Sequence, residues 1–345
     1  MKKLALLGVL CFALSLPVVS ATVQSNPSGY HLVDSLKLGG EGGWDLLETD
    51  TAAHRLYISR GTRVQVVDCV KDSLVGEIPN TNGVHGIAVA PFAGKGFTSN
   101  GKDSTVTVFD LKTLKQVAVI KLQASKPDAI LFDEASKRVF VFNGGSNNAV
   151  AIDAARNTVV GTVSLEGKPE LAVADGKGKV FVNIEDKSQV AEFDAITLKV
   201  MHTWSLAPGK EPSGIAIDRL HRRIFSVCSN NLMIILDADS GKVLGQVPIG
   251  SGVDGAGFDP SSLFAFSSNG EGTLTVVHEE SPAKFSVVEN VTTRKAARTM
   301  VVDEKTHRIY MLSAQFGPTP APTPEHPHPR GAIIPGSVTL YVVGR

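Results

Sequence analysis

Short apolar runs of four to six residues recur along this chain, and clusters of Gly, Asn, Asp and Ser separate them. Apolar positions that alternate with polar ones indicate β-strands, and the clusters between them indicate tight turns. Apolar residues at helical spacing are scarce. The pattern therefore predicts an all-β fold made of many short strands.

One sequence phrase returns along the chain. It consists of an apolar run, an anchor residue, four further residues, a basic residue and an apolar-aromatic run, and weaker copies depart from it slightly. The anchors are Asp50, Ala90, Asp133, Asp175, Asp218, Asp259 and Asp303. Successive anchors are 40 to 44 residues apart, which is the period of propeller blades.

Two further sequence signals recur at nearly constant distances from the anchors. An alternating strand ends 18 to 20 residues after each of the first six anchors, at Asp68, Asp110, Asp153, Asp194, Asp237 and His278. Turn signals lie ten and eleven residues after four anchors, at Arg60-Gly61, Asn100-Gly101, Asn143-Gly144 and Asn269-Gly270. Asn-Gly favours a two-residue hairpin, because both positions tolerate positive φ. We therefore predict a seven-bladed β-propeller with four antiparallel strands per blade.

The last blade is short of one strand. Its predicted strands cover residues 299–302, 309–312 and 338–343, after which the sequence ends. Residues 31–38 form a surplus strand before the first unit. We expect this N-terminal strand to complete the last blade, which closes the ring and removes a free strand edge.

The first 21 residues have the pattern of a signal peptide. Lys2 and Lys3 precede an apolar stretch over residues 4–19, and Ala21 is the small residue after which cleavage is expected. The stretch is too short for a stable membrane span. We therefore expect residues 22–345 to form one propeller domain outside the cytoplasm, periplasmic or secreted, as for a bacterial-type signal peptide.

Charge and cysteine usage restrict the picture further. The chain has 34 basic and 34 acidic residues and a pI near 7.1, so no nucleic-acid partner is expected. The mature chain keeps Cys69 and Cys228, which the repeat map places on blades three apart. A disulfide needs Cα atoms within about 7 Å, so we expect two free thiols.

Some of these units resemble a known repeat. The segments are Arg138-Val-Phe-Val-Phe-Asn143, Lys179-Val-Phe-Val-Asn183, Asp110-Leu-Lys-Thr-Leu-Lys-Gln-Val117 and Asp194-Ala-Ile-Thr-Leu-Lys-Val200. They resemble the YVTN family of seven-bladed propellers, also called YncE-like, over about residues 30–345. The resemblance implies the propeller fold and an exported binding or surface protein.

A ring of polar residues is expected at the channel mouth. The residue five before each anchor is polar in all seven units, namely Asp45, His85, Asp128, Glu170, Ser213, Asp254 and Arg298. Residues at the same phase of a circular repeat are related by the blade rotation. We therefore expect them around one axis near one face, where they either bind a ligand or only contact water and loop backbone.

The composition of this ring suggests its ligands. Its four carboxylates suit a divalent cation, or a cationic or polyhydroxylated small molecule, and Arg298 suits an anionic end. The residue types leave the identity of a bound metal open. The Pro-rich insertion 316–336 is expected to approach the same face as a lid, and its His326 and His328 are a further candidate metal pair. The glycines over 39–43 are expected to give Trp44 and Asp45 access to the channel.

We found neither a nucleophile elbow nor a zinc-protease helix motif in the sequence. We therefore expect a non-enzymatic, exported propeller scaffold that is monomeric and binds a small molecule or a protein partner at the channel mouth. The alternative is a metal-assisted hydrolase or lactonase-like enzyme that uses the polar ring, in which His85 pairs with Asp45 or Asp128.

Overall fold

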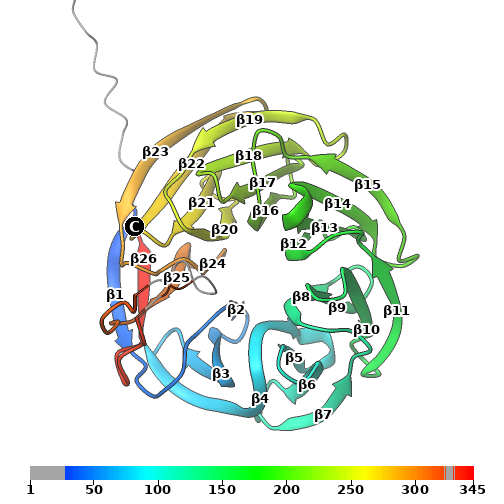
Figure 1. The fold of residues 1–345 in the computed structure, drawn as a ribbon, viewed down its shortest axis with the longest axis vertical. Coiled ribbons are helices and arrows are strands. Elements are labelled where there is room, and N and C mark those ends of the chain that lie inside the picture. Colours follow the sequence, from blue (N-terminus) through cyan, green and yellow to red (C-terminus); the bar gives the residue numbers. More distant parts are fainter. Residues whose placement is uncertain (1–27, 322, 324–328, 330) are drawn as a thin grey trace, which may run out of the picture.

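The computed structural model describes residues 28–321, 323, 329 and 331–345, and its strands form a ring around one axis (Figure 1). The predicted signal peptide, residues 1–21, lies outside this part of the chain. Two short 3₁₀ helices, η1 (Pro91–Ala93) and η2 (Glu185–Lys187), interrupt the strands. Within the described residues, no helix has the length and apolarity needed to cross a membrane.

The strands follow a repeating order from the inside of the ring to its outside (Figure 1). The innermost strands are β2 (Leu47–Asp50), β4 (Ser73–Ala90, second half), β8 (Pro127–Asp133), β12 (Pro169–Ala174), β16 (Pro212–Asp218), β20 (Val253–Asp259) and β24 (Met300–Asp303). The next strands are β3 (Arg55–Asp68), β5 (Lys95–Asn100), β9 (Arg138–Asn143), β13 (Lys179–Ile184), β17 (Arg223–Cys228), β21 (Phe264–Asn269) and β25 (Arg308–Ser313).

The outer half of the ring completes this order. The third strands are β6 (Thr105–Asp110), β10 (Asn148–Asp153), β14 (Gln189–Asp194), β18 (Leu232–Asp237), β22 (Thr273–Ser281) and β26 (Thr339–Gly344). The outermost strands are β1 (His31–Lys37), β7 (Gln116–Lys121), β11 (Thr158–Ser164), β15 (Val200–Ser205), β19 (Val243–Pro248) and β23 (Lys284–Thr292).

Hydrogen bonds group these strands into six antiparallel sheets, five of four strands and one of six. The all-β propeller and the four-stranded blade are thus confirmed, whereas the number of sheets differs from the seven predicted. The difference arises in the first two units, where β3 has 14 residues and β4 has 18. Each of these strands runs through two predicted strands without a break, so both units belong to the sheet β2-β3-β4-β5-β6-β7.

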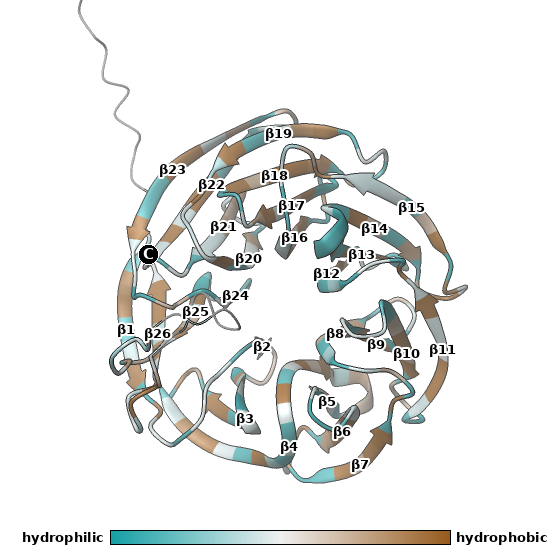
Figure 2. Ribbon diagram, viewed as in Figure 1, coloured by the Kyte–Doolittle hydropathy of each residue, from teal (hydrophilic) through white to brown (hydrophobic). Residues whose placement is uncertain are grey.

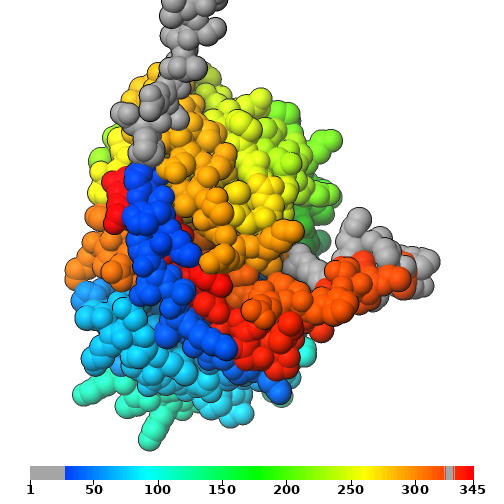
Figure 3. All heavy atoms as spheres, turned by 90° about the vertical axis from the view of Figure 1, so that its left-hand side faces the viewer, coloured from blue at the N-terminus to red at the C-terminus, as the bar shows by residue number. Residues whose placement is uncertain are grey.

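The N-terminal strand completes the last sheet, as predicted. β1 pairs antiparallel with β26 from His31↔Gly344 to Lys37↔Thr339, in the sheet order β1-β26-β25-β24. Figure 3 shows β1 in blue alongside β26 in red. Tyr30, 2% exposed, packs edge-on against Phe266 of the preceding sheet with ring centroids 5.1 Å apart. The first and the last strand of the described chain are therefore joined within one blade.

Aspartates shape the turns that lead to the outermost strands. Asp110 Oδ1, for example, accepts hydrogen bonds from the backbone N–H groups of Lys112 and Thr113. The same arrangement recurs at Asp68, Asp153, Asp194 and Asp237. An aspartate that accepts these N–H groups replaces backbone partners and favours the turn. The recurrent Asp that marks the third strand is therefore a turn-forming residue.

The predicted Asn-Gly hairpins have the right place but the wrong geometry. Asn100, Asn143 and Asn269 are fully buried last residues of strands, and positive φ falls later, for example at Ser104 and Asn147. The turns are thus longer than two residues. The asparagine stays in the strand because its side chain bonds across the hairpin: Asn100 Nδ2 donates to both Thr105 and Thr107.

The core lies between neighbouring sheets. Apolar residues lie mainly in the strands (Figure 2). One cluster joins Phe140 of β9 to Phe193 of β14 with ring centroids 5.1 Å apart, and the other interfaces are filled in the same way. Because each sheet buries both of its faces, the ring holds its inner strands in fixed positions.

Cys69 and Cys228 are both free in the described structure. Cys228 is fully buried at the end of β17, the second strand of its sheet, as predicted. Cys69 directly follows β3 and packs beside the cluster around Tyr310.

Candidate functional site

All seven residues of the predicted ring line one cavity of about 370 Å³. Each lies in, or just before, the first residues of an innermost strand, so the strands deliver them to one end of the ring. The common placement agrees with the repeat phasing. Whether these residues bind a ligand stays a prediction.

Backbone irregularities present these side chains to the cavity. The pairing of the inner strand with the next strand shifts register at the position of five of the seven residues, His85, Asp128, Glu170, Ser213 and Asp254. Asp128, for example, lies between the paired residues Pro127 and Ile130. A bulge of this kind re-aims a side chain and ends the regular pairing. The repeat therefore produces an equivalent inward position in each of these units.

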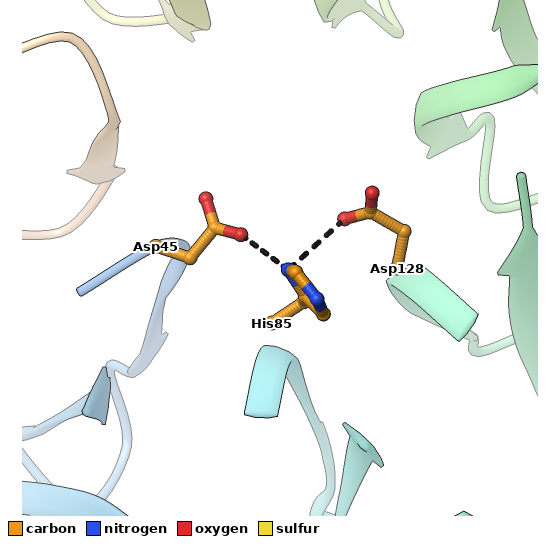
Figure 4. A group of neighbouring side chains, drawn as sticks. All are labelled: Asp45, His85 and Asp128. Atoms are coloured by element: carbon orange, nitrogen blue, oxygen red, sulfur yellow. Dashed lines mark hydrogen bonds and ion pairs between the residues drawn. The ribbon is translucent and has the colours of Figure 1, made fainter. Parts of the chain in front are cut away.

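Asp45, His85 and Asp128 form one side of the cavity (Figure 4). The Nδ1 atom of His85 lies 2.6 Å from Oδ2 of Asp45 and 3.7 Å from Oδ1 of Asp128. A Cβ on Gly101 would come within 2.6 Å of the imidazole ring. The glycine of this hairpin therefore leaves room for the His85 side chain.

The charges of this group depend on one another. The hydrogen bond with Asp45 raises the pKa of His85 above its usual value, against the effect of burial. Burial raises the pKa of Asp128, while the nearby His85 acts in the opposite direction. A proton on the imidazole and a charge on Asp45 are thus mutually stabilising.

A lysine and two glutamates form the next part of the wall. Lys168 Nζ lies 2.7 Å from Glu170 Oε1 and also contacts Glu185 of η2. Burial raises the pKa of Glu170 to about 7, because one ammonium group shared with Glu185 offsets its desolvation only in part. Burial acts to lower the pKa of Lys168, but the hydrogen bonds to both carboxylates outweigh it and raise that pKa.

The remaining residues of the predicted ring, Ser213, Asp254 and Arg298, contact one another or nearby backbone. Arg298 Nη1 lies 3.2 Å from Asp254 Oδ2, and Ser213 Oγ donates a 3.4 Å hydrogen bond to the carbonyl of Val253. The Arg298 charge therefore offsets that of Asp254. At the corner of Asp45 and Asp128 the facing base is the imidazole of His85, which carries a positive charge only when it is protonated.

Three charged residues of the wall were not found from the sequence, Lys168, Glu185 and Glu211. They lie outside the phase that the repeat rule follows. A signal existed at Glu185, which directly follows the second strand of its unit, where Gly101, Gly144 and Gly270 follow theirs. With these residues, the wall has six carboxylates against Lys168, Arg298 and His85. An excess of carboxylates in a confined space favours cationic ligands.

A smaller apolar pocket of about 200 Å³ adjoins the cavity and shares Arg298 with it. Trp44 and Phe316 line this pocket, with ring centroids 6.4 Å apart. Phe316 pairs with Ile333 in an isolated bridge at the base of the Pro-rich insertion. The base of the insertion thus lies beside the mouth, and the predicted His326 and His328 lie outside the described residues.

The chemistry available here is that of an acidic, half-open site. One ligand atom each from Asp45, His85 and Asp128 lie within 4.8 Å of one another, a spacing that a divalent cation can bridge. The same imidazole and carboxylates also suit an organic ammonium group.

No family model and no curated protein matches this chain. Its fold is similar to a chain in the crystal structure of the mitotic checkpoint complex, with a TM-score of 0.72 and 12% identity over 88% of this chain and 94% of that chain. U3-55K is also similar, with a TM-score of 0.75 and 8% identity over 91% of this chain and 99% of that chain. At such identities the likeness shows the fold alone, a β-propeller. Membership of the YVTN family stays a prediction.

Proposed function

We propose that this chain is a non-enzymatic propeller scaffold that binds a small cationic ligand at its channel mouth, outside the cytoplasm. One observation carries the proposal: the seven equivalent inner positions converge on one cavity of about 370 Å³ with six carboxylates in its wall. A cavity of that volume suits a small molecule. The pattern of residues 1–21 supports export of the chain.

The corner formed by Asp45, His85 and Asp128 is the expected binding position for the positive charge. Lys168 and Arg298 already offset carboxylates elsewhere in the wall. At the corner, two carboxylates face a single imidazole. A ligand ammonium group placed there gains two charge-assisted contacts.

Titration calorimetry with spermidine as the probe tests this function. We expect binding that weakens at least tenfold in Asp128→Asn, because the variant removes one of the two corner carboxylates. Glu304→Gln is the matched control, since it removes one negative charge from an exposed turn away from the cavity. If both variants bind spermidine like the wild type, attraction is due to general surface charge and the proposed site is wrong.

A metal-assisted hydrolase of the lactonase type is the second candidate. The close approach of ligand atoms from Asp45, His85 and Asp128 favours it. Metal analysis of purified protein distinguishes the two: stoichiometric metal that is lost in Asp128→Ala supports the enzyme. Spermidine binding, with no metal equivalent that is lost in Asp128→Ala, supports the scaffold.

A protein partner at the same mouth is a further form of the scaffold proposal. The structural likeness to a chain of the mitotic checkpoint complex is in keeping with it, as an analogy at the level of the fold alone. The apolar pocket at Trp44 and Phe316 offers a contact for such a partner beside the acidic cavity. Pull-down of a partner by the wild type but not by Trp44→Ala supports this form.

We also infer that the six-stranded sheet is two blades, so that the ring has seven. β4 pairs with β3 through Ser73–Pro79 and once more at Val84, where its pairing with β5 begins and continues to Ala90. Residues with positive φ, Asn80 and Gly83, lie between these two stretches. An apolar cluster with Tyr57 and Phe109 fills the space between the two halves. Faster amide hydrogen exchange at 80–83 than on either side supports two blades, and uniform protection opposes them.

A further inference from the structure

A second group of acidic and imidazole side chains lies away from the cavity. Asp218 is the last residue of β16, the strand whose second residue is Ser213 at the mouth. At about 3.3 Å per residue, the strand separates the two by roughly 17 Å. His221 follows in the turn after β16, and Glu279 comes from β22 of the neighbouring sheet. The group therefore lies at a junction of two sheets.

The contacts within this group are close. His221 Nδ1 lies 2.6 Å from Asp218 Oδ2 and 3.9 Å from Glu279 Oε1. The side chains of Asp218 and Glu279 are 1% and 3% exposed, whereas that of His221 is 40% exposed. Two buried carboxylates thus share one imidazole that faces solvent.

The other units of the repeat show which contacts of Asp218 recur among them and which are particular to this group. Asp218 Oδ1 accepts the backbone N–H groups of Leu220 and His221, and other anchors accept N–H groups of their turns in the same way. The turn accounts for this oxygen. It does not account for a buried glutamate beside it. At the preceding junction the equivalent aspartate, Asp175, instead meets Arg222 at 2.9 Å.

One carboxylate oxygen of Glu279 has no hydrogen bond within the described part of the chain that accounts for its burial. Glu279 Oε2 is buried and has no hydrogen-bond partner among the described residues. Arg223, whose charge acts on Glu279, forms its own contacts with Asp237 at 3.0 Å and with the carbonyl of Pro282 at 3.2 Å. A buried carboxylate oxygen without a donor is costly. A cation bound between the side chains would offset that cost.

We propose that Asp218, His221 and Glu279 bind a divalent transition-metal cation, with Zn²⁺ the best-suited ion, at this junction. One ligand atom from each residue lies within 4.8 Å of the others, so small inward movements place all three about 2.0–2.2 Å from one ion. An imidazole with two carboxylates favours Zn²⁺ over Ca²⁺, which prefers an all-oxygen shell. The solvent-facing imidazole leaves a path for the ion. The bound ion joins two sheets of the ring and is independent of the channel mouth.

Zinc binding by the full mature chain tests this site. After chelator treatment, we expect ZnCl₂ to bind and to raise the melting temperature by about 4 °C at a hundredfold excess over Kd. His221→Ala should bind one equivalent less than its parent and lose most of this rise. The experiment is done in wild type and in Asp128→Asn, so that zinc at the mouth does not obscure the difference. His202→Ala, which removes another exposed histidine, should behave like the wild type.

Glu279→Gln provides a second variant of nearly the same shape. It should fold and lose the same equivalent of zinc, while His221→Ala removes a ligand without leaving a buried cavity. Unchanged zinc stoichiometry in both variants overturns the proposal. So does a wild-type chain that takes up no zinc at this junction, which leaves a proton shared by the two carboxylates as the explanation.

Discussion

His85 Nδ1 lies 2.6 Å from Asp45 Oδ2, although the two residues are 40 positions apart and belong to consecutive units of the repeat. Each occupies the same phase before its anchor, so the blade rotation places one beside the other. The channel mouth is thus a set of contacts between neighbouring units. A substitution in one unit should therefore change the pKa of a side chain in the next unit.

Asp45→Asn should lower the pKa of His85. The Asp45 hydrogen bond is the main cause that raises this pKa, and without it burial, which lowers the pKa, has more weight. Because the folded-state pKa exceeds the ordinary 6.5, the associated stability is present below pH 6.5 and is lost as pH rises through the folded value. NMR titration of the imidazole resonances measures the shift. An unchanged midpoint in Asp45→Asn would contradict the contact.

Glu170→Gln should gain stability relative to wild type as the pH rises. Burial raises the pKa of Glu170 from 4.5 to about 7, so the folded state binds the proton more tightly than the unfolded chain. The wild type therefore loses stability between these values, by at most about 3 kcal/mol, and a neutral amide does not. Urea unfolding at pH 4.5 and pH 8 measures the change. If the free energy of unfolding of Glu170→Gln minus that of the wild type is the same at both pH values, or is lower at pH 8, the prediction is wrong.

The sequence predicted the ring because the residue five positions before the anchor is polar in all seven units. Equivalent positions of the repeat lie at the same end of the ring, which is the channel mouth. The same rule does not include Lys168, Glu185 and Glu211, which reach the cavity from η2 and from positions just before β12 and β16. These side chains belong to the cavity wall because they lie close to it in space, and they do not occupy the repeat position that the sequence rule follows. The balance of charge in the cavity therefore became clear only from the structure.

The turns show a second limit of the sequence pattern. Asn100-Gly101 predicts where the chain turns, because asparagine and glycine both favour turns. It does not predict that Asn100 stays in the strand, since that depends on Thr105 and Thr107 across the hairpin. The merging of two units in one sheet has a similar origin, because the hydrogen bonds continue through β3 and β4.

The two thiols should differ in native reactivity yet both remain free. Burial raises the pKa of Cys69 and of Cys228 to about 11, which leaves little thiolate at neutral pH. Folded protein made under oxidising conditions should react slowly with DTNB, and Cys228, fully buried, should react more slowly than Cys69. After denaturation two thiols should titrate. Fewer than two in a monomer would mean that the cysteines pair or are oxidised.

Removal of residues 22–38 should open the ring, because β26 then loses its partner β1. Tyr30→Ala tests the same closure with a single change. Its ring packs against Phe266, and its hydroxyl donates a 3.3 Å hydrogen bond to Asp259, so β1 is held to the preceding sheet as well as to its own. Loss of a buried aromatic ring costs about 3–5 kcal/mol, whereas Tyr30→Phe should cost only about 1 kcal/mol. Thermal and urea unfolding of the deletion and both variants measure the effects. A deletion with the wild-type melting temperature would show that the ring does not depend on this strand.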